Sequence, residues 1–191
     1  MKKMILAACA SASLLLVACG GGGDDPAPPQ QAAAPAPATT PVATPAAVTC
    51  PDSYSKISGK IQNVTTTIYA GDKPGNNFAQ LTLKTPADAT ADLKICLGKL
   101  TSLPAGTVGD VAYEIRGTKE FDTSTNRQLV VTVPTTGTIA SNPTVRFYTL
   151  GDDGKATASA LTAAPTFDIV SGKVVVTVPL GQRGLYTVKL P

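Results

Sequence analysis

The chain has 191 residues, 43% of them hydrophobic, with 16 basic and 13 acidic side chains, no histidine and no tryptophan. Without histidine, Ser-His and Cys-His nucleophile pairs and histidine-containing zinc sites are excluded, because each of them needs an imidazole. The near balance of charge, without any block of one sign, argues against nucleic acid as a partner. The composition therefore predicts a protein without enzymatic activity and without a cofactor.

The first 18 residues have the pattern of a secretory signal. Lys2 and Lys3 form a short basic start, and an uncharged apolar run follows over residues 4–17. This run is too short for a membrane-spanning helix, which needs about 20 apolar residues, but it suits a signal peptide. It ends in Leu16-Val17-Ala18-Cys19, which resembles the lipobox of bacterial lipoproteins. The earlier Leu6-Ala7-Ala8-Cys9 has similar letters but would leave an apolar run of only a few residues.

The resemblance to bacterial lipoproteins implies cleavage after residue 18 and acylation of Cys19 with fatty acids such as palmitate. In lipoproteins of the enterobacterial type, Asp after the acylated cysteine retains the protein at the inner membrane. Here that residue is Gly20. The resemblance therefore implies a protein anchored by lipid to the outer membrane of a Gram-negative bacterium. The sequence leaves open whether it faces the periplasm or the cell surface.

Residues 19–48 are predicted to be a disordered linker. They hold seven of the 16 prolines, a run of glycines over 20–23, and no aromatic residue. Such a segment buries too little apolar surface to offset the entropy lost on ordering. Spaced prolines favour an extended chain of about 3.1 Å per residue, or roughly 90 Å for 30 residues. We interpret the linker as a passive spacer; a proline-rich docking site is the alternative.

Two cysteines remain once Cys9 is removed with the signal and Cys19 is acylated. Cys50 and Cys96 form an even pair in an oxidising compartment, which predicts a disulfide bond. The bond would close a loop of about 47 residues and hold the start of the domain to its body. A redox-active dithiol is disfavoured, because the pair lacks CxxC spacing.

Residues 49–191 are predicted to form one all-β domain. Val, Ile, Thr and Tyr are abundant, turn residues recur at short intervals, and apolar residues alternate with polar ones. The expected strands are 56–62, 65–70, 79–84, 111–116, 129–133, 144–150, 173–178 and 185–190. Many short strands of this kind indicate an antiparallel β-sandwich.

Residues 85–100 fit two structures. Thr85-Pro86-Ala87-Asp88 has the residues of a helix start, with Ala89, Leu93, Leu97 and Leu100 following at helical spacing. Leu93, Ile95 and Leu97 also alternate with Lys94 and Cys96, and we favour a strand from Leu93. In that strand Cys96 would face away from the leucines, so the disulfide would cross the outside of the sheet.

Two patterns bear on the type of sandwich. Val130-Val131-Thr132-Val133-Pro134 recurs as Val175-Val176-Thr177-Val178-Pro179, which suggests two β subunits with a boundary near residue 138. Gly184-Leu185-Tyr186-Thr187-Val188 resembles the strand that carries the tyrosine corner in immunoglobulin-like sandwiches. That resemblance implies an immunoglobulin-like fold, although the buried tryptophan of the family is missing.

No segment predicts a catalytic or metal site. Gly151-Asp152-Asp153-Gly154 is interpreted as a turn, because it lacks the spacing of a calcium loop. Residues 122–126 are expected at a polar hairpin tip. Glu114, Glu120 and Asp122 are close in sequence, but Glu114 is expected on the wet face of a strand and the other two beside a hairpin.

The sequence therefore favours a non-catalytic interaction or structural module. Its expected partners are the membrane, through the lipid on Cys19, and a protein in the envelope or outside the cell. Two alternatives remain: a periplasmic lipoprotein that binds a small ligand or glycan, and an enzyme inhibitor. The second needs only a suitably shaped loop, which the composition does not exclude.

Overall fold

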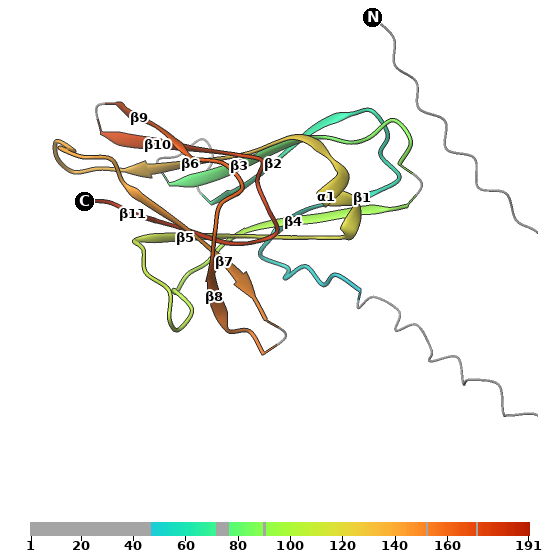
Figure 1. The fold of residues 1–191 in the computed structure, drawn as a ribbon, viewed down its shortest axis with the longest axis horizontal. Helices are drawn as coiled ribbons and strands as arrows, with labels where there is room; N and C mark the ends of the chain where they lie inside the picture. The colour runs from blue at the N-terminus through green and yellow to red at the C-terminus, as the bar shows by residue number, and fades with distance from the viewer. Residues whose placement is uncertain (1–46, 72–76, 90, 152, 171) are drawn as a thin grey trace, which may run out of the picture. The chain divides into compact units, whose positions relative to one another are not determined.

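The computed structural model describes residues 47–71, 77–89, 91–151, 153–170 and 172–191. The predicted signal peptide, Cys19 and the linker as far as residue 46 lie outside these described residues. The described part is an antiparallel β-sandwich (Figure 1). The strands are β1 (Ser55–Gly59), β2 (Thr65–Gly71), β3 (Phe78–Lys84), β4 (Leu93–Lys99), β5 (Val111–Gly117), β6 (Thr125–Pro134), β7 (Thr144–Leu150), β8 (Ala156–Ser159), β9 (Thr166–Val170), β10 (Lys173–Pro179) and β11 (Gly184–Lys189), and a short helix, α1, spans Lys119–Thr123.

The strands form two sheets. Sheet A has the order β1-β4-β5-β11-β7-β8, and sheet B has the order β2-β3-β6-β10-β9. Figure 1 shows sheet B as the upper layer, with the β7–β8 hairpin extending downward from sheet A. In each sheet the strands that precede residue 138 lie on one side and those that follow it lie on the other: β5 meets β11 in sheet A, and β6 meets β10 in sheet B. The two copies of the repeated pentapeptide are paired neighbours, β6 and β10, within one sheet.

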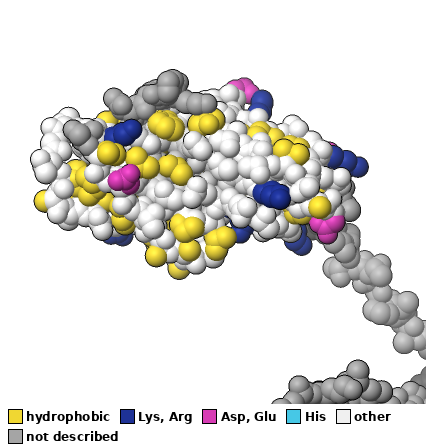
Figure 2. Space-filling view, turned by 90° about the horizontal axis from the view of Figure 1, so that it is seen from above, with side chains coloured by type: hydrophobic (Ala, Val, Ile, Leu, Met, Phe, Trp, Pro, Cys, Tyr) yellow, Lys and Arg dark blue, Asp and Glu magenta, His cyan; other side chains and the backbone are white. Residues whose placement is uncertain are grey.

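The core lies between the sheets and follows from alternation along the strands. In β3, Ala79, Leu81 and Leu83 are fully buried, whereas Gln80 and Thr82 are only half-buried on the other face. Each fully buried Leu or Val stabilises the fold by about 1.5–3 kcal/mol relative to an exposed one. Figure 2 shows the outer face of sheet B, where charged side chains are few and scattered.

The outer face of sheet A is covered by two stretches of chain. The N-terminal segment (residues 47–54) lies over β4 and β5, attached through the disulfide. The loop of residues 100–110 lies over β11 and β7, where Thr187 donates a hydrogen bond to the Val108 carbonyl (2.6 Å) and the Val108 N–H donates to the Tyr148 hydroxyl (3.1 Å). A second apolar cluster of Ala112, Tyr148 and Leu185 forms beneath this cover. Sheet A is therefore buried on both faces over much of its centre.

All eight predicted strands are confirmed, with ends that differ by up to four residues. Leu93–Lys99 is a strand, so the helical alternative for 85–100 is wrong within the described residues of that range. The β8 and β9 strands were not predicted. The Tyr186 hydroxyl donates to the Gln182 carbonyl (2.9 Å) and accepts from the Gln182 N–H (2.5 Å), which confirms the predicted tyrosine corner.

No helix among the described residues is both long enough and apolar enough to cross a membrane.

Candidate functional site

The Cys50–Cys96 disulfide is present and lies on the outer face of sheet A, as predicted. The two Cα atoms are 5.7 Å apart, and Cys96 is fully buried. In β4 the leucines at 93 and 97 enter the core, so Cys96 and Gly98 face the opposite side. The ring of Tyr54 lies directly on Gly98, where a Cβ atom would collide with it. The missing side chain at residue 98 therefore makes room for the N-terminal segment.

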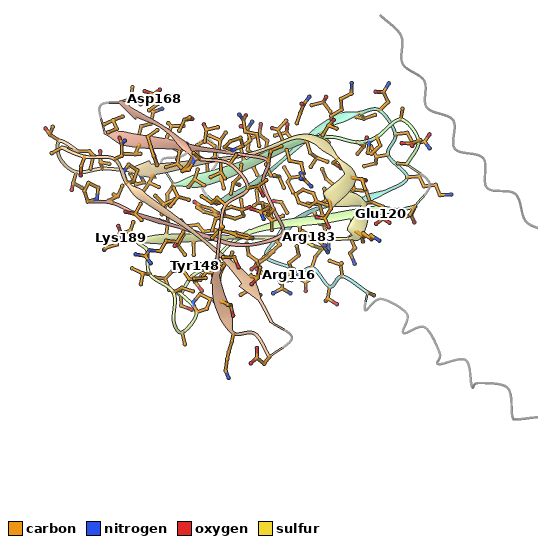
Figure 3. The ribbon with its side chains drawn as sticks, viewed as in Figure 1. Arg116, Glu120, Tyr148, Asp168, Arg183 and Lys189 are labelled. Carbon is orange, nitrogen blue, oxygen red and sulfur yellow. A yellow bond between two sulfur atoms is a disulfide. The ribbon has the colours of Figure 1, made fainter. Side chains whose placement is uncertain are left out.

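A hollow of about 730 Å³ opens on sheet A beside the N-terminal segment. We call it the outer hollow. Four charged residues line it, from β5, α1 and the stretch before β11: Glu114, Arg116, Asp122 and Arg183. Figure 3 shows Arg116 and Arg183, from different parts of the chain, in this region of the domain. The charges make this hollow the strongest candidate for a functional site.

Glu114 is the centre of a buried polar cluster. Only 3% of it is exposed. One carboxylate oxygen accepts a hydrogen bond from the Tyr54 hydroxyl (2.5 Å), and the other accepts from Nε of Arg116 (2.7 Å). Arg116 also donates through Nη1 to the Thr49 carbonyl (3.4 Å), and its guanidinium lies 5.8 Å from the centre of the Tyr54 ring. The cluster therefore joins the N-terminal segment to sheet A a second time, through β5 and independently of the disulfide on β4.

The expected position of Glu114 on a wet strand face is wrong. Its face of β5 is covered by the N-terminal segment, because the disulfide holds that segment against β4. A carboxylate is tolerated there because both of its oxygens are hydrogen-bonded and a cation is in contact.

The pKa values of Tyr54 and Arg116 suit groups that hold the structure together and not groups that exchange protons. Burial raises the pKa of Tyr54, and the hydrogen bond to the Glu114 carboxylate raises it further. The same carboxylate raises the pKa of Arg116 through its hydrogen bond. Tyr54 therefore remains a neutral donor and Arg116 a cation throughout the physiological range. Neither group is therefore suited to act as a general base toward a substrate.

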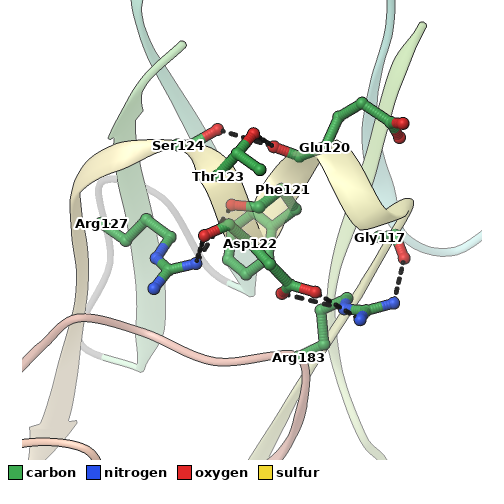
Figure 4. Close-up of polar contacts among 8 residues, drawn as sticks. All are labelled: Gly117, Glu120, Phe121, Asp122, Thr123, Ser124, Arg127 and Arg183. Carbon is green, nitrogen blue, oxygen red and sulfur yellow. Dashed lines mark hydrogen bonds and ion pairs between the residues drawn. The ribbon is translucent and has the colours of Figure 1, made fainter. Parts of the chain in front are cut away.

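The second charged pair ties α1 to the stretch before β11 (Figure 4). Asp122 accepts two hydrogen bonds from Arg183, from Nε (3.1 Å) and from Nη2 (2.5 Å). The remaining guanidinium nitrogen, Nη1, donates to the Gly117 carbonyl (3.1 Å). Both side chains are about two-fifths exposed, so the pair contributes at most about 1 kcal/mol despite its bidentate geometry.

Helix α1 is held mainly by its one buried side chain. Phe121 is fully buried and enters the core. Arg127 donates through Nη1 to the carbonyls of Phe121 (3.2 Å) and Asp122 (2.7 Å) and lies over the Phe121 ring. The expected polar hairpin tip at residues 122–126 is therefore wrong: α1 ends at Thr123 and β6 begins at Thr125. Glu120 and Asp122 belong to the helix instead of flanking a hairpin.

The turn predicted at residues 151–154 is confirmed for its described residues. The Gly154 N–H donates to the Gly151 carbonyl (2.9 Å), which closes the turn between β7 and β8. Asp152 lies outside the described residues. Within the described ranges, no group of three or more Cys, Asp or Glu side chains is placed to hold a metal ion.

Each of the four charged groups in the outer hollow thus has a partner within the domain. Both oxygens of Glu114 and both oxygens of Asp122 accept hydrogen bonds. The hollow has the acids that hydrolytic chemistry uses, but they are already committed to arginine and tyrosine. The arrangement fixes loops and the N-terminal segment on sheet A, and it leaves the exposed guanidinium edges as the groups that can contact a ligand.

Substituting Tyr54→Phe is expected to lower the free energy of unfolding by about 1–2 kcal/mol, because one oxygen of the buried Glu114 would lose its donor. Chemical denaturation of the full-length variant and wild type would measure the difference. Ser53→Ala is the matched control, since Ser53 is an exposed neighbour and should change stability by less than about 0.5 kcal/mol. Equal effects of the two substitutions would contradict the role given to the Tyr54 hydroxyl.

Sequence reasoning missed the contacts of Tyr54, Arg116 and Arg183. Tyr54 and Glu114 are 60 residues apart and Arg183 and Asp122 are 61 apart, so no local spacing signals either pair. One usable signal was Gly98 in a strand interior, because glycine in a strand often marks the close approach of another part of the chain.

No protein-family model matches the chain, and no curated protein and no solved structure shows significant similarity to it.

Proposed function

We propose that the chain is an outer-membrane lipoprotein whose β-sandwich is a non-catalytic interaction module. The observation that carries the proposal is the place of the disulfide. It joins the first described residues after the predicted linker to β4. Because β4 is the second strand of sheet A, the bond reaches the sheet inside its edge strand, β1. A pull along a lipid-anchored linker would then reach the interior of the sheet through a covalent bond. This arrangement suits a domain that is held by its N-terminus.

The non-catalytic part of the proposal is supported by the outer hollow, where arginine or tyrosine engages each carboxylate. A direct test is turnover of envelope substrates by the purified full-length chain. Turnover that disappears in both Glu114→Gln and Asp122→Asn would contradict the proposal.

Lipid attachment predicts a sharp difference between two cysteine variants. In a Gram-negative host supplied with an alkyne fatty acid, Cys9→Ala should keep the label, and Cys19→Ala should lose it and leave the membrane fraction. The physical reason is that acyl chains provide the anchor, at about 0.8 kcal/mol for each buried methylene. Labelling is read on a gel after attachment of a fluorophore. Label that persists in Cys19→Ala would contradict anchoring at that residue.

Protease added to intact and to permeabilised cells would then separate the two possible faces of the membrane. Cleavage of the domain in intact cells indicates a surface partner, and protection until permeabilisation indicates a periplasmic one.

A ligand-binding lipoprotein is the second candidate, favoured by the volume of the outer hollow. About 730 Å³ falls within the range of 300–1,000 Å³ that is usual for small-molecule sites. The exposed edges of Arg116 and Arg183 favour an anionic ligand over a neutral one. A thermal-shift series with simple carboxylates and phosphates would support this candidate only if the melting temperature rose with ligand concentration.

A further inference from the structure

The β9 edge of sheet B leaves core-facing side chains uncovered. Phe167 and Ile169 pair with Val176 and Val174 of β10, which are fully buried in the core. Residues directly opposite each other on paired strands point to the same face, so Phe167 and Ile169 also face the core side. Ile169 is nevertheless 43% exposed. The core side of the sheet is therefore incompletely covered at this edge.

A groove lined by both aliphatic and threonine residues runs beside this uncovered side chain. It has a volume of about 480 Å³ and is bounded by Ile169 and Val170 on β9 and by Ile139 and the preceding residues 135–138. Ile139 packs against the core from the other side of the groove. Val170, which points to the outer face, is 42% exposed, so aliphatic side chains are accessible on both faces of this short strand.

The backbone of β9 is also open on one side. β9 is the last strand of sheet B, and among the described strands none lies beyond it. Alternate N–H and C=O groups of such an edge strand face outward and can pair with an added strand. An open edge, a groove and exposed aliphatic side chains together suit an extended peptide segment.

The charge on β9 distinguishes between occupants. Asp168 is exposed at the middle of the strand and, opposite Val175, lies on the outer face. Full antiparallel pairing of two β9 strands would place Asp168 of one copy directly opposite Asp168 of the other. Like charges in that position are destabilising, whereas an opposite charge is favourable. A second copy of the chain is therefore disfavoured, and a basic partner residue is favoured.

We propose that β9 receives, as an added strand of sheet B, an extended segment of another protein with Lys or Arg opposite Asp168. The residues on either side of that cation are aliphatic, because they face the same side as Phe167 and Ile169 and enter the groove. The inference rests on the proposed function of the domain as an interaction module, and it assigns that function a surface and a partner chemistry.

The test uses two synthetic peptides of equal shape, Ser-Thr-Val-Lys-Val-Thr-Ser and Ser-Thr-Val-Glu-Val-Thr-Ser. Their symmetry places the same residue opposite Asp168 in either strand direction. Nuclear magnetic resonance of the isotope-labelled full-length chain reports where and how tightly each binds. We expect shift changes centred on residues 166–170 and 135–139. The lysine peptide should bind roughly 2- to 10-fold more tightly than the glutamate peptide.

Three variants make the result specific. Asp168→Lys should reverse the preference between the peptides, and Ile169→Thr should weaken both. Thr65→Lys, on the opposite edge strand β2, is the matched control and should change neither.

Several outcomes would overturn the proposal. They are equal binding of the two peptides, shift changes elsewhere on the domain, no binding at all, or a dimer in sedimentation that Ile169→Thr dissociates. None of them would decide lipid anchoring or turnover, because those are measured through Cys19, Glu114 and Asp122, away from β9. A failure of the β9 proposal is therefore distinguishable from a failure of the proposed function.

Discussion

Replacing Cys50 and Cys96 together by alanine is expected to lower the free energy of unfolding by about 4 kcal/mol. The cysteines are 46 residues apart, and the chain-entropy model gives about this value for a loop of that length. For a domain of this size, the loss corresponds to a melting temperature lower by about 8–16 °C. Thermal unfolding of the full-length double variant and wild type measures it directly.

The effect should be largest in the N-terminal segment. Without the disulfide, the hydrogen bonds of Tyr54 and Arg116 are left to hold residues 47–54 against sheet A. Amide exchange in this segment should therefore rise more than in the central strands β3 and β6. Wild-type protein treated with reductant is the control and should lose the same stability. If the double variant melted within about 2 °C of wild type, the disulfide would not be a main stabilising bond.

A strand is easy to predict from the sequence when one of its faces is open to solvent, and hard to predict when both faces are covered. β3 has the core on one side and a mostly uncharged open face on the other, so its alternation is visible in the sequence. β5 and β11 are buried on both faces over most of their length. In such strands a polar residue is satisfied by distant parts of the chain. Glu114 was misplaced because the segment that covers it comes from residues 47–54.

The other elements that the sequence did not predict are short. β8 is a four-residue strand of Ala, Thr and Ser with mostly exposed side chains, so it has no hydrophobic alternation to detect. α1 has five residues, far fewer than an isolated helix needs to be stable. It forms because Phe121 reaches the core and Arg127 binds its last carbonyls, and both contacts are tertiary.

The disulfide and the tyrosine corner were predictable for a different reason, since each depends on few residues. Once Cys9 and Cys19 are assigned to the signal and to the lipid, Cys50 and Cys96 can pair only with each other. The corner needs only a tyrosine near the start of a strand and a backbone partner a few residues before it. The outer hollow and the groove at β9 combine residues from segments that are distant in the sequence, and no local pattern marks them.

Substituting Tyr186→Phe is expected to lower the free energy of unfolding at neutral pH by about 2–3 kcal/mol. The change removes two hydrogen bonds to Gln182 in a site where Tyr186 is only 1% exposed. The ring itself stays, so its contact with Phe147, 4.9 Å between ring centres, is retained. The expected fall in melting temperature is about 5–10 °C.

The same residue predicts an alkaline dependence with a definite sign. Burial raises the pKa of Tyr186 from 10.0 to about 12 in the folded protein. A group whose folded pKa exceeds its unfolded pKa stabilises the fold fully below the unfolded value. That contribution is therefore present below about pH 10 and is lost as the pH rises through 12. Denaturation curves across this range should show wild type losing more stability than Tyr186→Phe, so that the two converge. Parallel curves would mean that the Tyr186 hydroxyl does not govern the alkaline limit, and that Tyr54, whose pKa is also raised by burial, is the group to substitute next.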